Sequence, residues 1–132
     1  MKAEERIAAR EAPERLERMK PVLDRIPDHW GKYLPDPGWD ELLLSLNETV
    51  SVLDPGYQIL QAKEKFGTLR FYVELSEDLP ADRRELIHTI ISEVEVQSSV
   101  VCEDCGVTGA RGRDGGWIKT LCDDCAHGYG KG

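Results

Sequence analysis

The sequence predicts an α+β protein in which amphipathic helices pack on a central β-hairpin and a cysteine-rich tail follows. Three observations support this prediction. Two segments, at about 37–53 and 80–98, repeat apolar residues at helical spacing. Between them, residues 57–75 alternate apolar and polar side chains, which is typical of a half-buried hairpin. All four cysteines lie in the last 31 residues.

The length of 132 residues suits one compact domain or a domain with a small appendage. We divide the chain into an N-terminal helical segment and loop at 1–35, a helix–hairpin–helix core at 36–100 and a tail at 101–132. Residues 2–26 favour helix, and Pro21 is expected to kink or end it. Before Pro13 the chain consists mostly of charged residues and alanine, so helix and a frayed end both fit. The expected apolar stripe is Leu16, Met19, Leu23 and Ile26.

Residues 27–38 contain three prolines and two glycines and therefore predict a loop. We expect Trp30, Tyr33 and Leu34 to dock from this loop onto the core. The helix at 37–53 then begins with Asp36 as N-cap and Pro37 at the first helical position. Its acids at the start, Asp40 and Glu41, are interpreted as partners of the helix dipole rather than catalytic groups. The buried stripe comprises Trp39, Leu42, Leu43, Leu46, Val50 and Leu53.

The segment Asp54-Pro55-Gly56-Tyr57 predicts a type II turn, with Pro and Gly at the two central positions. The hairpin follows, with its loop around Phe66-Gly67. A two-residue loop places Lys63 opposite Arg70, Ala62 opposite Phe71 and Leu60 opposite Val73, so that polar and apolar side chains segregate. A three-residue loop with Gly67 in the left-handed region is the alternative. The predicted polar face holds Gln61, Lys63, Lys65, Arg70 and Tyr72.

A further helix is expected from Leu79-Pro80 to about Ser98. Acidic residues surround it, and the chain as a whole carries a formal charge of −8. Such a field repels phosphate backbones and attracts basic surfaces. The buried stripe of this helix is Leu86, Ile87, Ile90, Ile91 and Val94.

The cysteines form the pattern C-x₂-C-x₁₆-C-x₂-C, which is typical of a structural zinc site. Two cysteines three residues apart in a tight turn present both sulfurs to one ion, and a second pair completes a tetrahedron. Four protein ligands leave no open position, so the expected Zn²⁺ is structural. The fold class becomes α+β with a C-terminal zinc ribbon. The predicted ligands are Cys102, Cys105, Cys122 and Cys125.

Other interpretations of the tail stay open at this point. The cysteines also suit disulfides or an iron–sulfur cluster, and His127 is a replacement for Cys125 as ligand. Gly106 is expected to adopt positive φ after the first pair, and residues 117–121 to form a strand that delivers Cys122. Each pair encloses two acids, which we expect to point outward into water: Glu103, Asp104, Asp123 and Asp124.

Several parts of the sequence together resemble a family of small uncharacterised bacterial and phage-borne proteins. They are "GW" at a helix start, the hairpin "KEKFGTLRFY", the helix ending in Ser-Ser, "CEDCG", "GGWIKTLC" and "DDCA". The resemblance covers roughly residues 38–127. In that family the last ligand position is often His, whereas this chain has Cys125. The resemblance implies the architecture and the metal and carries over no catalytic residue.

Two functions from different classes remain. The first is a non-enzymatic protein-binding module, an acidic inhibitor, immunity protein or phage accessory factor whose partner is a basic protein. The second is a nucleic-acid-binding regulator, against which the sequence pI near 4.9 argues. We expect a cytoplasmic protein with no membrane partner, because no signal or apolar span is present. The candidate binding surface comprises Lys63, Lys65, Arg70, Tyr72, Arg111, Arg113, Trp117 and Lys119.

Overall fold

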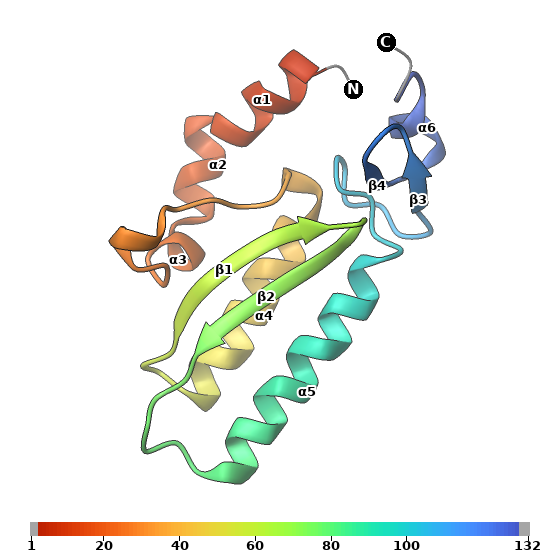
Figure 1. Ribbon diagram of the computed structural model, residues 1–132. Helices are drawn as coiled ribbons and strands as arrows, with labels where there is room; N and C mark the ends of the chain where they lie inside the picture. The colour runs from red at the N-terminus through yellow and green to blue at the C-terminus, as the bar shows by residue number, and fades with distance from the viewer. Residues whose placement is uncertain (1–2, 130–132) are drawn as a thin grey trace.

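The computed structural model describes residues 3–129 and is an α+β fold, as predicted (Figure 1). Two small antiparallel sheets are present, each a single hairpin. The helices are α1 (Ala3–Glu11), α2 (Pro13–Arg18), α3 (Lys20–Leu23), α4 (Asp40–Leu53), α5 (Ala81–Ser98) and α6 (Asp123–Ala126). The strands are β1 (Gln58–Lys65), β2 (Thr68–Glu74), β3 (Arg111–Asp114) and β4 (Ile118–Leu121), and short 3-10 turns cover Asp28–Trp30 and Pro37–Trp39.

The long hairpin β1–β2 lies against α4 and α5, which form the layer behind it (Figure 1). The predicted pairing of Lys63 with Arg70 and of Ala62 with Phe71 is confirmed. Leu60 does not pair with Val73, because a bulge after Ile59 shifts the register and brings Ile59 opposite Val73 instead.

The hairpin loop has two residues, so the three-residue alternative is wrong. Phe66 has φ 53° and Gly67 has φ 81°, which are the two positive φ values that a type I′ turn requires. A bulky aromatic residue rarely takes this conformation. The turn after α4 closes with the Tyr57 N–H donating to the Asp54 carbonyl, but Gly56 lacks positive φ, so it is not the predicted type II turn.

The main core lies between the hairpin and the two long helices, and the predicted stripe of α4 faces it. Trp39, Leu43, Leu46 and Val50 are buried. On α5, Ile87 and Ile91 are buried, whereas Leu86 points to solvent. A second, small cluster lies in the tail and comprises Cys102, Ala110 and Leu121.

Three N-terminal predictions need correction. Residues 3–23 form three short helices, because the chain breaks before Pro13 and again at Met19. Each break resets the helical phase, so Val22 is buried and Leu16 is exposed. The loop aromatics Trp30 and Tyr33 do not dock on the core: their exposed fractions are 54% and 79%.

Candidate metal centre

The four cysteine sulfurs gather at the junction of the first cysteine turn and the end of β4. All four Sγ atoms lie within 4.8 Å of one another. In the first turn, the Gly106 N–H donates to the Cys102 carbonyl at 2.9 Å, and Gly106 has φ 83° as expected. Strand β4 delivers Cys122, whose sulfur accepts from the Cys125 N–H. The turn at each pair therefore aims both of its sulfurs at one point.

The donor set fits a metal ion such as zinc. A tetrahedron with Zn–S bonds of about 2.3 Å requires sulfurs about 3.8 Å apart, and Cys105 Sγ lies 3.7 Å from Cys122 Sγ. All four cysteines are free rather than disulfide-bonded. Burial raises the pKa of the Cys102 thiol, but N–H groups directed at its sulfur outweigh this and leave the pKa below its ordinary value. Such N–H groups stabilise a thiolate, which is the form that binds metal.

The acids of the first cysteine pair correct a prediction. Glu103 and Asp104 are only 2% and 7% exposed, so they do not point into water. Asp123 and Asp124 of the second pair are exposed, as expected. Burial raises the pKa of Glu103 to about 7, against the opposing effects of Lys119 and of the Thr120 N–H.

Lys119 is the cation that faces these buried acids. Its ammonium contacts Asp36 and lies 3.3 Å from Glu103 Oε1 and 3.4 Å from Asp104 Oδ1. Burial alone lowers the pKa of Lys119, but the acids raise it above its ordinary value. Lys119 is 7% exposed, so it is not part of an open binding surface.

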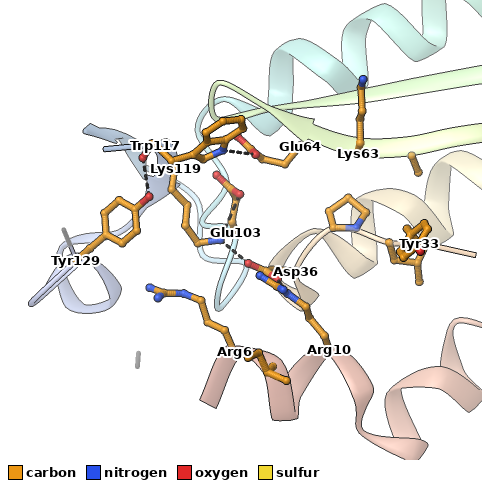
Figure 2. A pocket seen from close by; sticks show the side chains of 14 residues that line it. Arg6, Arg10, Tyr33, Asp36, Lys63, Glu64, Glu103, Trp117, Lys119 and Tyr129 are labelled. Carbon is orange, nitrogen blue, oxygen red and sulfur yellow. Dashed lines mark hydrogen bonds and ion pairs between the residues drawn. The ribbon is translucent and has the colours of Figure 1, made fainter. Parts of the chain in front are cut away.

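Helix α1 joins the same cluster through two arginines (Figure 2). Arg6 donates to both carboxylate oxygens of Asp104, and Arg10 pairs with Asp36. Asp36 therefore binds two cations, and these hold its pKa below its usual value although burial opposes ionisation. We call Arg6, Arg10, Asp36, Glu103, Asp104 and Lys119 the ion-pair cluster. It balances three cations against three acids beside the cysteines.

The backbone at Gly38 docks directly on the first cysteine pair. The Gly38 N–H donates to the Glu103 carbonyl at 2.8 Å. The neighbouring Trp39 indole donates to the Val101 carbonyl at 2.9 Å. A Cβ at Gly38 would lie 2.1 Å from the Cys102 carbonyl oxygen, so only glycine allows this approach. The start of α4 and the cysteine turn thus form one packed unit.

The structure places most of the remaining candidate surface residues on the outer side of the hairpin and the tail. Lys65 and Tyr72 are exposed, and Lys63 and Arg70 are half-buried. Among residues 3–129, none of the three cations Lys63, Lys65 and Arg70 has an acidic ion-pair partner. These residues stay available for an external ligand.

In the tail, the other candidates have different surroundings. Arg111 is exposed, whereas Arg113 pairs with Asp123 at 2.8 Å. Trp117 stacks on Phe66 of the hairpin loop, with ring centroids 6.3 Å apart. Its indole N–H donates to Glu64. The stacked pair therefore joins the tip of the hairpin to the β3–β4 turn.

Sequence reasoning missed Arg6, Arg10 and the role of Asp36. Arg6 is 98 residues from its partner Asp104, and Asp36 is 26 residues from Arg10 and 83 residues from Lys119. No local sequence pattern indicates contacts between residues so far apart. Asp36 also fits a helix N-cap in the sequence, although its side chain makes no capping hydrogen bond. The only available signal was the unusual pair of acids inside the first cysteine turn.

Comparisons of the chain with protein-family models, curated proteins and solved structures gave no match. Within the described part of the chain, no helix combines the length and apolar character that a membrane crossing requires.

Proposed function

We propose that this chain is a non-enzymatic protein-binding module whose C-terminal ribbon is held together by a structural zinc ion. The observation that carries the proposal is the outer hairpin face. It presents Lys63, Lys65 and Arg70 without acidic partners among residues 3–129, beside the exposed aromatic ring of Tyr72. Arginine and tyrosine are enriched among the residues that dominate protein interfaces.

Exposed aromatic rings support the same proposal. Trp30, Tyr33, Phe66 and Trp117 are each more than half exposed. Such rings bury a large area at low entropic cost when a partner covers them. They occur on the loop, the hairpin tip and the tail, so the proposed surface spans all three parts.

In this proposal zinc has a structural role and no catalytic one. Cys102, Cys105, Cys122 and Cys125 supply four sulfur ligands, and a complete tetrahedron leaves no position for substrate. The tail has only a small core cluster of its own. The metal would therefore supply much of the free energy that keeps residues 101–129 folded.

The acidity of the chain suggests the kind of partner. Residues 76–101 hold six acids against two arginines, and exposed members of this set surround α5. An acidic field of this kind accelerates association with a basic protein. This supports an inhibitor or immunity protein, or a phage accessory factor that acts on a host protein.

Capture of the partner tests the proposal. The zinc-loaded chain, immobilised through a tag, is used to isolate bound proteins from the cell that makes it, followed by mass spectrometry. The purified partner is then titrated at increasing salt concentration. We expect the association rate to fall as ionic strength rises. An affinity that does not change with salt contradicts steering by the acidic surface.

A nucleic-acid-binding regulator is the second candidate, and one observation favours it. The stacked Phe66–Trp117 pair lies beside Lys65, whose ammonium is 5.9 Å from the Phe66 ring centroid. Single-stranded nucleic acids bind to such combinations of ring and cation. Two other ribbon cations, Arg113 and Lys119, are already paired with acids. A gel-shift assay at low salt distinguishes the two candidates. Tight binding of DNA or RNA would favour the nucleic-acid-binding regulator over the protein-binding module.

A further inference from the structure

The loop between α3 and α4 carries two large rings that do not reach the core. Trp30 and Tyr33 are each more than half exposed, and Figure 1 shows this loop running past the hairpin. A single exposed apolar group is common on protein surfaces, whereas several of them around a hollow often mark an interaction site. The surroundings of these two rings therefore indicate whether they have a role.

The loop is held in place by contacts of its own. The Lys32 ammonium donates to two backbone carbonyls near the end of α3, those of Leu23 at 2.8 Å and Ile26 at 2.6 Å. Gly31 has φ 77°, and a Cβ at this position would lie 2.9 Å from Tyr33 Cε2. The ring of Tyr33 thus lies directly against the glycine. Because the ring is already positioned, covering it costs a partner less conformational entropy.

A pocket of about 290 Å³ lies between this loop and the hairpin. This volume is at the lower limit of the range of about 300–1,000 Å³ for small-molecule sites, so it suits a single side chain. Ile26 and Ala62 are buried, whereas the other apolar and aromatic lining residues are half-buried or exposed, so a side chain can enter from solvent. The apolar and aromatic lining comprises Ile26, Trp30, Tyr33, Leu60, Ala62 and Tyr72.

The local charge at this pocket is positive, although the whole chain is acidic. Lys63 lines the pocket, and its ammonium lies 5.9 Å from the ring centroid of Tyr72. None of the described lining residues is acidic. Lys63 and Arg70, which lie opposite each other in the hairpin, have no acidic ion-pair partner among residues 3–129. A carboxylate brought to the pocket would therefore find a free cation.

We propose that this pocket is the anchor site of the protein interface. It receives one apolar side chain of the partner protein between Trp30, Tyr33 and Tyr72, and a carboxylate next to that side chain pairs with Lys63. The inference rests on the proposed function, since the occupant belongs to a protein. Binding energy at interfaces is concentrated in a few anchors that fill such pockets.

The positive pocket is compatible with a basic partner. Steering acts at long range on the net charges of the two proteins, whereas Lys63 requires only one local acid. A nucleotide fits the pocket less well, because base, sugar and phosphate together are much larger than one side chain. The acidic field of the chain also repels phosphate.

The test uses the ¹⁵N-labelled, zinc-loaded full chain and three small probes. N-acetyl-leucine carries an apolar side chain next to a carboxylate, N-acetyl-leucinamide lacks the charge, and N-acetylglycine lacks the side chain. The chain has three tryptophans, and the indole N–H signals of Trp30, Trp39 and Trp117 report on the pocket, the core and the tail. We expect N-acetyl-leucine to shift the Trp30 signal alone, with a millimolar dissociation constant, and N-acetylglycine to shift none.

Comparison of the two leucine probes tests the role of Lys63. N-acetyl-leucinamide is expected to bind about two- to fivefold more weakly than N-acetyl-leucine, because it lacks a partly exposed ion pair. In Lys63→Met this preference for the acid should disappear. Arg83→Met is the matched control, since Arg83 is exposed on α5, and it should keep the preference.

A loop variant connects the pocket to the partner. Tyr33→Ala removes one wall of the pocket, keeps Trp30 as the reporter and deletes a ring that is 79% exposed, so the fold should persist. We expect it to abolish detectable binding of N-acetyl-leucine and to weaken the captured partner at least about tenfold. Val96→Ala, which removes an exposed side chain of α5, should change neither.

The outcomes separate this inference from the proposed function. An unshifted Trp30 signal at concentrations far above millimolar, or tighter binding of adenosine monophosphate than of N-acetyl-leucine, overturns the inference. If the probes bind but Tyr33→Ala keeps full affinity for the captured partner, the anchor lies elsewhere, and the protein-binding function survives without this site. Probe binding without any captured protein contradicts the proposed function and reassigns the pocket to a small apolar acid.

Discussion

The ammonium of Lys119 lies 3.3 Å from the carboxylate of Glu103, although one residue belongs to β4 and the other lies inside the first cysteine turn. The contact is buried and is shared with Asp36, which precedes α4. One lysine therefore connects the two halves of the tail with the start of the main helical layer. This arrangement ties the surroundings of the cysteines to the main helical layer.

Replacement of Lys119 by methionine tests this connection. The side chain of Lys119 is 9% exposed, and its loss leaves Asp36, Glu103 and Asp104 facing one another without it. We expect the free energy of unfolding to fall by about 3–5 kcal/mol, the usual effect of removing one partner of a buried ion pair. Urea denaturation of the zinc-loaded protein measures this change.

Two controls accompany the Lys119 variant. Lys65→Met removes an exposed lysine from the hairpin and is expected to change stability by no more than about 0.5 kcal/mol. Adding Glu103→Gln to Lys119→Met neutralises the acid whose ion pair was with Lys119, and it is expected to restore part of the loss. Equal stability of the two lysine variants would contradict the buried role of Lys119.

The sequence predicts local structure well where one periodicity dominates. The stripe from Trp39 to Val50 and the alternation from Leu69 to Val73 each repeat without interruption, so α4 and β2 were found. The Lys63–Arg70 pairing followed from the segregation of polar and apolar faces. The cysteine spacing identified the metal-ligand candidates because the two short turns are themselves local.

Long-range ion pairs leave no such pattern. Asp36 precedes a proline and a helix, so its local surroundings are those of an N-cap, whereas its partners Arg10 and Lys119 lie far along the chain in opposite directions. The bulge after Ile59 was also missed, because one extra residue in a strand changes the register without changing the composition. Both the ion pairs of Asp36 and the bulge after Ile59 depend on tertiary packing, which a local sequence pattern does not report.

The close approach of Gly38 to the first cysteine turn gives a second prediction. In Gly38→Ala the new methyl group would lie 2.1 Å from the Cys102 carbonyl oxygen and 2.4 Å from the Glu103 carbonyl carbon. Both are backbone atoms, so the turn must shift. We expect a loss of stability of about 1–3 kcal/mol and weaker zinc retention. Thermal unfolding and a competition assay with a chromogenic chelator measure these effects.

Gly112→Ala is the matched control for Gly38→Ala. A Cβ at Gly112 meets only the Ile118 side chain, at an ordinary distance of 3.5 Å, and Gly112 does not have positive φ. We expect this variant to be at least as stable as the parent, because alanine reduces the entropy of the unfolded chain. If Gly38→Ala behaves in the same way, the docking of α4 on the cysteine turn is wrong.

The metal site gives a third prediction. Cys102→Ser combined with Cys105→Ser removes two of the four sulfurs, and we expect bound zinc to be lost and amides in residues 101–129 to exchange faster. Among residues 101–129, the main core cluster includes Val101 alone, so helices α4 and α5 should remain protected beyond the first turn of α4. Elemental analysis and hydrogen exchange followed by mass spectrometry provide the two measurements.

His127→Ala is the control for the cysteine variant. His127 is exposed and lies two residues after Cys125, where it was considered as an alternative ligand. Since four sulfurs already complete the set, we expect this variant to keep its full zinc content. Loss of zinc from His127→Ala, or native protein purified without any zinc, would overturn the four-cysteine site.

Asp54 gives a prediction about pH. Burial opposes ionisation of Asp54, but hydrogen bonds from Ser76 and Gly56 outweigh it and leave its pKa below the ordinary 3.8. A depressed pKa means that the stabilisation is complete above pH 3.8 and is lost only as the pH falls through the lower pKa of Asp54 in the folded state.

The variant Asp54→Asn tests this. The amide NH₂ of asparagine replaces one carboxylate oxygen, so at least one of the donating groups then faces another donor, and we expect the free energy of unfolding to fall by roughly 1–3 kcal/mol at pH 7. Urea denaturation of both proteins at each pH, which cancels any shared loss of zinc in acid, should show a constant difference from pH 7 to 5. A difference that already closes in that range would mean that the Asp54 carboxyl is not held in its ionised form.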